Sequence, residues 1–388
     1  MKPVLSGYDL YRFIDSLGYR CQVIAPSLVP EKAGDKIKTD RKDTEKLEPE
    51  RVMFCGRENL SKEAVNLSQK QIEFTAIDNR NVNIYDEIMI LTKETKLKID
   101  NSKKHYDSLK AGRESLLGII FESELPESVY NSNAIENSTL TIDETEKILM
   151  ELEISRNVSV REVFEARNLA RVFEYIKDKV AAKDLSEELV LLLHKMLISN
   201  INEGIAGRFR KQNEYVRVGT HIAPAPEHVE RMIDAVLLEY SSNHSTHFLE
   251  RIARFHLDFE QIHPFVDGNG RIGRVLINYQ LMQLGFPPVI IRNKEKASYY
   301  ASFREYNDNH RTTSMVKVLY LATLESFHKR IAYLSGDTIV RVSEYVKTTG
   351  QSPQILLNKA KRQTIPAFRE KGVWKIGVTG DLSSKETT

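Results

Sequence analysis

Most of the side chains that could perform chemistry together lie within twelve residues, from His263 to Arg274. Gly268–Gly270, at the start of a predicted helix, leaves backbone N–H groups free to hold phosphate oxygens. Arg271 and Arg274 lie three positions apart on that helix, and each can bind a phosphate through two parallel hydrogen bonds. Asp267 adds a carboxylate suited to a nucleotide's Mg²⁺, and a histidine such as His263 can accept a proton near neutral pH. The combination predicts a site for phosphoryl or nucleotidyl transfer.

Each part of this stretch also has an ordinary structural explanation. A Gly-Asn-Gly sequence is often a turn, a single histidine is often structural, and arginines on a helix commonly face water. Their order within twelve residues favours the functional interpretation. By contrast, His256 and His194 lie within apolar stripes of predicted helices, and we expect both to be packed side chains.

The stretch resembles the signature of the Fic family, His-x-Phe-x-(Asp/Glu)-Gly-Asn-Gly-Arg-x-x-Arg, at every fixed position. The resemblance implies transfer of AMP from ATP to a Ser, Thr or Tyr hydroxyl of a target protein. It implies that His263 deprotonates the hydroxyl and that Asp267 holds Mg²⁺ on the α- and β-phosphates. Arg271 and Arg274 would bind the β- and γ-phosphates. The anion hole is assigned to Gly268, Asn269, near the α-phosphate, and Gly270, whose small size favours nucleotidyl over phosphoryl transfer.

Two further segments take roles from the same resemblance. Residues 213–224 are β-branched and aromatic around a Gly-Thr turn and predict a hairpin. This hairpin is similar to the family's flap, which pairs with the target backbone as an added strand, through Tyr215, Val216, Arg217, Val218, Gly219 and Thr220. Residues 296–300 resemble the segment that walls the adenine site, and nucleotide contacts are therefore also assigned to Tyr299, Tyr300 and, on the signature helix, Asn278.

A short segment upstream resembles the inhibitory motif of the family, (Ser/Thr)-x-x-x-Glu-(Gly/Asn), placed N-terminal to the signature. Its residues here are Ser132, Glu136 and Asn137. By resemblance, Glu136 pairs with Arg274, takes away the partner of the γ-phosphate and blocks a productive pose of ATP. Read alone, a Ser and a Glu four residues apart share one helix face and indicate nothing more than a helix end.

Outside these segments the sequence is dominated by helical periodicity. Apolar residues recur three or four positions apart, and the pattern predicts helices over 82–121, 142–154, 159–182, 185–200, 227–240, 246–262, 270–284 and 296–332. We therefore expect a mainly α fold, a Fic-type helical bundle over 82–332 that includes the inhibitory helix and carries the β-hairpin flap.

The two ends differ from this bundle. Residues 337–378 predict a helix, a tight turn, a second helix from Pro353 and a small hairpin, which resembles a winged-helix module. DNA contact through the basic segment 353–375, with Lys359, Lys361 and Arg362 on the second helix, stays open against a protein-docking role. Residues 1–51 resemble part of an insertion-sequence transposase followed by a charged linker, without the remaining carboxylates of a two-metal nuclease.

Composition bounds the remaining possibilities. The 388 residues carry a net charge of +2 and two cysteines, which excludes a disulfide framework and fits a reducing, cytoplasmic compartment. No leader and no membrane-spanning run is expected. We expect an autoinhibited protein adenylyltransferase that uses ATP and Mg²⁺ and modifies itself as well as an unknown target. A nucleotide-sensing DNA-binding regulator, a de-AMPylase that uses Glu136, and a homodimer stay open as alternatives.

Overall fold

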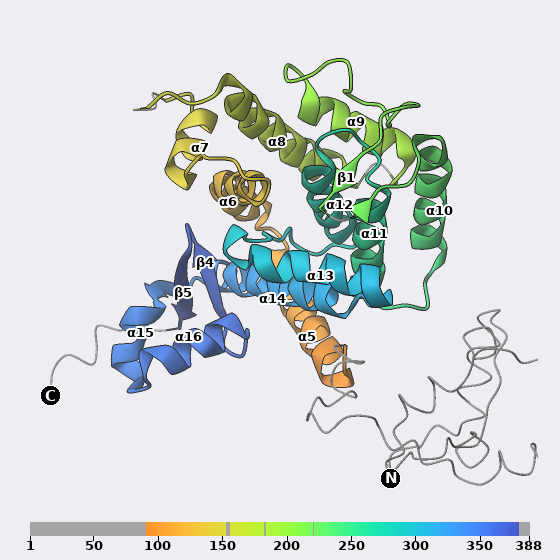
Figure 1. The fold of residues 1–388 in the computed structure, drawn as a ribbon. Helices are drawn as coiled ribbons and strands as arrows, with labels where there is room; N and C mark the ends of the chain where they lie inside the picture. Colours follow the sequence, from red (N-terminus) through yellow and green to blue (C-terminus); the bar gives the residue numbers. More distant parts are fainter. Residues whose placement is uncertain (1–90, 153–155, 182–183, 220, 380–388) are drawn as a thin grey trace, which may run out of the picture. The chain divides into compact units, whose positions relative to one another are not determined.

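The computed structural model describes residues 91–152, 156–181, 184–219 and 221–379. This part is mostly helical, which confirms the expected mainly α class (Figure 1). The N-terminal segment 1–51 and Thr220 of the predicted flap lie outside the described residues. No helix within the described ranges has the length and apolar content needed to cross a bilayer.

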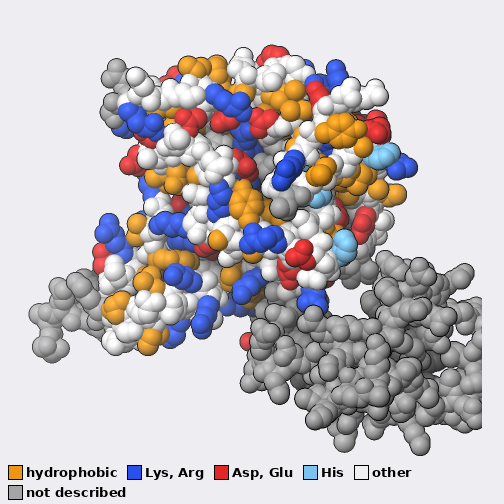
Figure 2. All heavy atoms as spheres, in the orientation of Figure 1, with side chains coloured by type: hydrophobic (Ala, Val, Ile, Leu, Met, Phe, Trp, Pro, Cys, Tyr) orange, Lys and Arg blue, Asp and Glu red, His pale blue; other side chains and the backbone are white. Residues whose placement is uncertain are grey.

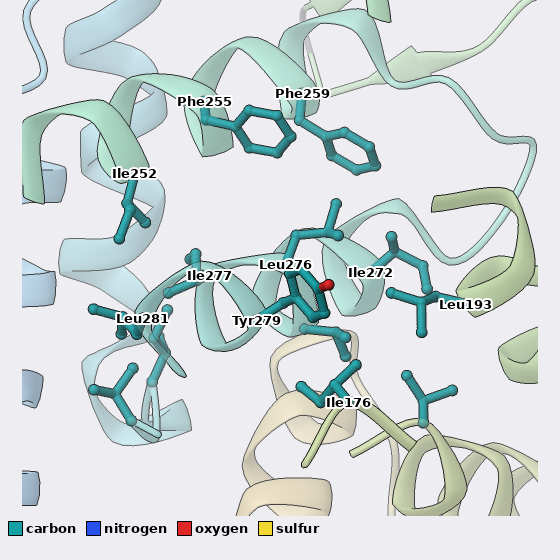
Figure 3. Packing of buried hydrophobic residues seen from close by; sticks show 14 of the residues in the cluster. Ile176, Leu193, Ile252, Phe255, Phe259, Ile272, Leu276, Ile277, Tyr279 and Leu281 are labelled. Atoms are coloured by element: carbon teal, nitrogen blue, oxygen red, sulfur yellow. The ribbon is translucent and has the colours of Figure 1, made fainter. Parts of the chain in front are cut away.

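The centre of the fold is a pair of packed helices, α11 (Phe248–Ile262) and α12 (Asn269–Gln283). The apolar face of α11 carries Ile252, Phe255 and Phe259, and these side chains point toward Ile272, Leu276 and Ile277 of α12 (Figure 3). Almost every side chain of α12 is buried, including its arginines. Because the helix after the signature loop is enclosed by the core, its N-terminus is held in a fixed position.

Further helices surround this pair. They are α5 (Lys93–Lys110), α6 (Glu114–Ile135), α7 (Ile142–Leu149), α8 (Val160–Lys179), α9 (Glu187–Ile198), α10 (Val229–Ser242), α13 (Lys296–Asn309) and α14 (Thr313–Ser335). Several begin at residues whose side chains accept backbone N–H bonds; Thr141, for example, forms a full capping box with Glu144 at the start of α7. Helices α6 and α8 both pack against α12 and thereby reach the signature.

Two predicted helices are broken in the structure. The single helix expected over 296–332 is split into α13 and α14, because His310 ends α13 in a left-handed conformation with φ 53°. Helices α5 and α6 are likewise separated at Gly112, which has φ 72°. Apolar periodicity continues across both breaks, and for this reason the pattern alone predicted longer helices.

The predicted hairpin is present as two very short antiparallel strands, β1 (Arg217–Val218) and β2 (His221–Ile222). The side chains of Tyr215, Val218 and Ile222 are exposed. The pair lies in front of α11 and α12 in Figure 1. Because the pair of β1 and β2 exposes apolar side chains and an unpaired edge, it is able to accept a further strand.

Residues 338–378 form a small group of helices and strands at the end of α14, here called the C-terminal layer. The expected helices α15 (Val342–Thr349) and α16 (Pro353–Lys361) and the hairpin β4 (Ala367–Glu370) and β5 (Val373–Val378) are present. A strand missed from the sequence, β3 (Thr338–Arg341), completes an antiparallel sheet of order β3-β5-β4. The sheet packs on α14 and has its own small core around Val342, Leu356 and Ile376.

Candidate functional site

The signature loop is a tight turn between two helices. His263 ends α11 with φ 49°, and Gly268 precedes α12 with φ 87°, a conformation in which an added Cβ would also lie 3.1 Å from Leu197. The amide of Asn269 closes the loop, because it accepts from the N–H of Phe265 and donates to the carbonyl of the same residue, both at 2.8 Å. The free N-terminus of α12 is therefore held open toward the cleft.

Neighbouring side chains hold this loop from outside. His194 is fully buried, stacks on Phe265 with ring centroids 3.6 Å apart, and contacts the carbonyl of Asp267 at 3.0 Å. Arg210 donates to the carbonyls of Ile262 and His263. The expectation that His194 and His256 are packed is met, since both are fully buried, and His194 additionally acts as a support of the loop.

Asp267 and Arg271 belong to a ring of charges that includes two residues missed in the sequence. Arg271 is 3.0 Å from Asp267 and 3.1 Å from Glu165 of α8. Arg161, also on α8, lies 2.5 Å from Asp267 and 3.1 Å from Glu165. Burial alone would raise the pKa of Asp267, but Arg271 and Arg161 lower it on balance, so the carboxylate is ionised. Residues 161 and 165 lie about a hundred positions from the signature, and no local pattern points to them.

Arg274 is buried and is held by the predicted inhibitory segment. Its guanidinium donates to Glu136 Oε1 at 2.9 Å, to Ser132 Oγ at 3.0 Å and to the Ser132 carbonyl at 2.8 Å. Ser132 is therefore a direct partner of Arg274 as well as part of the helix that carries Glu136. Asn137 has φ 69°, ends α6 and accepts from Lys296 at 2.8 Å.

Two tyrosines of α13 form one wall of the site. The hydroxyl of Tyr299 lies 3.4 Å from Arg274 and 2.7 Å from the ring of His256, and Tyr299 is almost fully buried. Tyr300 donates to the carbonyl of Ile135 at the end of α6. Burial, with Glu136 nearby, raises the pKa of Tyr300 to about 12, so its hydroxyl keeps its proton at neutral pH.

These groups line one cleft of about 530 Å³. Its walls bring together the signature, the end of α6, the start of α8, the flap and α13. The residues that line it include His263, Asp267, Gly268, Asn269, Gly270, Arg271, Arg274, Glu136, Asn137, Arg161, Glu165, Val218, Tyr299 and Tyr300. Burial lowers the pKa of His263 to about 4, and the imidazole is therefore neutral and able to accept a proton at pH 7.

Asn278 lies away from this cleft. Its side chain donates to the carbonyls of Val289 and Arg274 and accepts from the N–H of Val289 at 2.7 Å. Through these bonds the buried amide of Asn278 holds the segment at Val289, which follows α12. The nucleotide contact assigned to it in the sequence is thus corrected to a structural role, because one helical turn beyond Arg274 the side chain faces the core.

The cleft offers oxygen ligands that suit a metal ion bound together with a nucleotide. Among the described residues no group of three or more acidic, histidine or cysteine side chains could hold a metal ion by itself. Asp267 offers a carboxylate directly before the N-terminus of α12, whereas Glu136 and Glu165 of the same cleft are paired with Arg274 and Arg271. Mg²⁺ is commonly held by one or two carboxylates, with phosphate oxygens and waters as its other ligands, so these residues fit Mg²⁺ that arrives with a nucleotide.

Comparison with known proteins gives a consistent result. Residues 184–281 match the model of the Fic/DOC family. The chain is 30% identical over 245 residues to "Protein adenylyltransferase Fic" of Nematostella vectensis. This aligned region covers 62% of this chain and 56% of that protein. It is 28% identical over 262 residues to the protein of the same name from Drosophila melanogaster, covering 66% and 51% respectively. The chain thus spans about half the length of these curated relatives.

Solved structures share the helical arrangement. A Fic domain containing signaling protein from Bacteroides thetaiotaomicron superposes with a TM-score of 0.57 at 24% identity, covering 62% of this chain and 97% of that one. Fic-1 from C. elegans superposes with a TM-score of 0.56 at 23% identity, covering 71% and 77%. The described residues therefore have the fold of Fic-domain proteins, and the segment 184–281, which contains the whole signature, matches the Fic/DOC family.

Proposed function

We propose that this protein is an autoinhibited adenylyltransferase that transfers AMP from ATP to Ser, Thr or Tyr hydroxyls of a protein, itself included. The observation that carries the proposal is the cleft in which a neutral His263 lies beside the open N-terminus of α12 and the guanidinium of Arg271. The relatives named protein adenylyltransferase support the same reaction. A cytoplasmic location remains our expectation.

The residues divide the reaction among them. The N–H groups of Gly268–Gly270 and the helix dipole of α12 would bind the α-phosphate, and Arg271 the β-phosphate. Asp267 is the residue that would hold Mg²⁺, which neutralises charge on the phosphates when bound with ATP. His263 would remove the proton of the target hydroxyl, and Gly270 leaves the cradle open beside it. The exposed edge at Val218 would align the target as an added strand.

The contact between Glu136 and Arg274 is the proposed brake. While Arg274 is paired, the γ-phosphate lacks a charge-assisted bond worth about 1.5–3 kcal/mol and meets a negative charge nearby. A Cβ added at Gly270 would lie 2.2 Å from Glu136 Oε1, so the carboxylate also lies directly over the cradle. ATP would then bind with its α-phosphate out of line with the incoming hydroxyl.

His263→Ala tests the proposal. Full-length protein carrying Glu136→Gly is incubated with ATP labelled on the α-phosphate, and label on protein is measured. Loss of the base should lower transfer by about 10²–10⁴-fold while leaving ATP binding nearly intact. His228→Ala, an exposed histidine outside the cleft, is the matched control and should not change the rate. Equal labelling with and without His263 would overturn the assignment.

Two alternative activities have specific tests. Glu136 is close enough to the cradle to orient a water, so removal of AMP from a modified protein is the second candidate reaction; it predicts that wild type, and not Glu136→Gly, releases label from a labelled substrate. A DNA-binding regulator would use two exposed cations, Lys361, the last residue of α16, and Arg362, which directly follows this helix. Figure 2 shows Lys and Arg side chains on the face of this C-terminal layer, at lower left.

Charge reversal examines the DNA hypothesis in the intact chain. Lys361→Glu with Arg362→Glu should abolish retardation of a DNA duplex at low salt, because phosphate contacts supply most of such affinity. Lys317→Glu, an exposed cation on α14, is the control. Equal retardation by both variants would remove α16 from DNA binding. Gel filtration at several concentrations tests the proposed homodimer.

A further inference from the structure

Glu260 is a buried acid that faces His263 within the cleft. It lies on the last turn of α11, and its side chain is 12% exposed. Two of its groups approach the same ring nitrogen: its carbonyl oxygen is 3.3 Å from His263 Nδ1, and its Oε2 is 3.7 Å from that atom. The opposite ring nitrogen, Nε2, is left for the substrate side of the imidazole.

The fold bears a cost to keep this acid in place. Glu260 Oε1 accepts no hydrogen bond from any described residue, and a buried unpaired polar atom costs about 1–3 kcal/mol. The facing helix also leaves room for it, because a Cβ added at Gly273 would lie 2.6 Å from Oε1. An apolar side chain here would remove the cost of the unpaired oxygen, so the carboxyl group is explained better by a role in the cleft than by stability.

Charged groups reach His263 and Glu260 from several elements. They are Glu136 at the end of α6, Arg210 before the flap, His221 of β2 and Arg274 of α12. Burial raises the pKa of Glu260 to about 8, Glu136 adds to the rise and Arg274 opposes it. Glu260 is therefore mostly protonated at neutral pH, and its carboxylate forms as the pH rises. Departure of Glu136 removes the second cause of the raised pKa, whereas burial, the largest cause, remains and Arg274 still favours the carboxylate.

We propose that Glu260 is a positioning residue for His263: the Glu260 carbonyl holds a proton on His263 Nδ1, and the Glu260 carboxyl group, when ionised, stabilises the imidazolium formed during transfer. This inference rests on the proposed AMP transfer. In that step the hydroxyl oxygen bonds to the α-phosphorus, and the bond from that phosphorus to the bridging oxygen breaks. The electron pair leaves with pyrophosphate, and the hydroxyl proton moves to Nε2. In Ser-His-Asp triads an ionised acid beside the histidine likewise stabilises the imidazolium without accepting the proton, although there the acid and not a carbonyl bonds to Nδ1.

The test uses full-length protein with Glu136→Gly, alone and combined with Glu260→Gln. Gln keeps the shape of the side chain and removes its charge. The kcat of AMP transfer and KM for ATP are measured from about pH 6 to about pH 9, the range in which Glu260 loses its proton. Glu250→Gln, half-buried on the first turn of the same helix, is the matched control.

We expect kcat of Glu136→Gly to rise with pH as Glu260 ionises, and we expect this rise to be absent in Glu260→Gln, because glutamine cannot acquire the negative charge that stabilises the imidazolium. We expect transfer to fall about tenfold or more through kcat, less than on removal of the base itself, while KM for ATP changes little. Glu250→Gln should change neither. The inference is overturned if kcat of the Glu260→Gln variant follows the same pH profile as kcat of Glu136→Gly alone. If Glu136→Gly alone transfers no AMP at any pH, the proposed function fails and the inference fails with it, whereas transfer with an unchanged pH profile overturns the inference alone.

Discussion

Helix α6 carries two sets of ion pairs that differ in how firmly they are held. At its end, Glu136 offers one oxygen to Arg274 and keeps 38% of its side-chain surface exposed. About two and a half turns earlier, Glu127 is 5% exposed and accepts from Arg292 and from the N–H groups of Lys371 and Gly372, both at 3.1 Å. The first carboxylate can exchange its partner for water, whereas the second cannot without exposing three unpaired donors.

The neighbouring acid on α6 strengthens the second set. Glu124 is 3.2 Å from Lys329 and 2.6 Å from Arg330 of α14, and all three side chains are nearly buried. Through Glu127, which accepts from the N–H groups of Lys371 and Gly372 in the turn between β4 and β5, this hairpin contacts the same helix that carries the proposed brake. We infer that α6 is a fixed support with a releasable end, because burial and the number of partners fall along its length. The negative charge of Glu136 also lies at a helix C-terminus, where the dipole disfavours it by about 0.3–1 kcal/mol.

The largest effect is expected at the firm contact. Glu127→Ala leaves Arg292 with one of its two buried carboxylate partners, Glu325, and leaves two N–H groups without an acceptor. Breaking one partner of a buried ion pair typically costs about 3–5 kcal/mol. The free energy of unfolding in urea should fall by that amount. Glu122→Ala, exposed on the same helix, is the control, and a loss below about 1 kcal/mol at position 127 would contradict the comparison.

The C-terminal layer is joined to the helices around the cleft by further ion pairs, although residues 337–378 follow the signature and the flap in the sequence. Arg369 pairs with Glu325 at 2.5 Å and with Glu295, four residues before Tyr299, at 2.6 Å. The hairpin therefore supports both α6 and the segment leading into α13, and deletion of residues 337–388 would uncover buried acids.

The releasable end should respond in activity and hardly in stability. Glu136→Gly frees Arg274 and the space over Gly270. The rate of self-modification should then rise about 10²-fold, because a reacting group misplaced by about 1 Å can lower a rate by about that factor. Label from the α-phosphate of ATP is measured at fixed ATP and Mg²⁺. Arg274→Ala added to Glu136→Gly should abolish the gain. Equal incorporation by wild type and Glu136→Gly would show that Ser132 to Asn137 is only a helix end.

A smaller activation is expected from Ser132→Ala. The variant removes one of the four acceptors of Arg274 and leaves Glu136, the Ser132 carbonyl and the Tyr299 hydroxyl in place. A single hydrogen bond contributes about 1 kcal/mol net, which corresponds to roughly fivefold in rate. The readout is the same label incorporation, with Ser128→Ala, one turn earlier on α6, as the control. An activation as large as that of Glu136→Gly would assign the brake to the serine.

The sequence predicted what is local and missed what the fold assembles. The order of His263, Asp267 and Arg271 within twelve residues predicted that these side chains share one site, and the helical spacing of apolar residues predicted the mainly α class. The sequence offered no signal for Arg161 and Glu165, because only the packing of α8 on α12 brings them to Asp267. Local spacing also placed Asn278 on the signature helix without telling that its face is buried by the segment at Val289.

Glu260 marks the boundary between these two cases. It lies three residues before His263 on the last turn of α11, and an acidic residue at a helix end ordinarily predicts a side chain turned to solvent. Its contact with Nδ1 depends on the left-handed turn at His263, φ 49°, which bends the imidazole back over the last turn. A backbone conformation of that kind is not encoded by a periodic pattern, since histidine enters it only where the surrounding loop requires it.

The smallest effect is expected where the C-terminal hairpin meets α7 at the surface. Lys371 lies 2.5 Å from Glu146, but its side chain is 55% exposed, and such pairs contribute about 0–1 kcal/mol. Lys371→Met keeps the aliphatic stem and the backbone N–H that Glu127 accepts, so the free energy of unfolding should change by less than about 1 kcal/mol. A double-mutant cycle with Glu146→Gln, at low and high salt, isolates the pair. A coupling as large as the loss at Glu127 would mean that the hairpin is held through its exposed lysine, and the distinction between firm and releasable contacts on α6 would no longer follow burial.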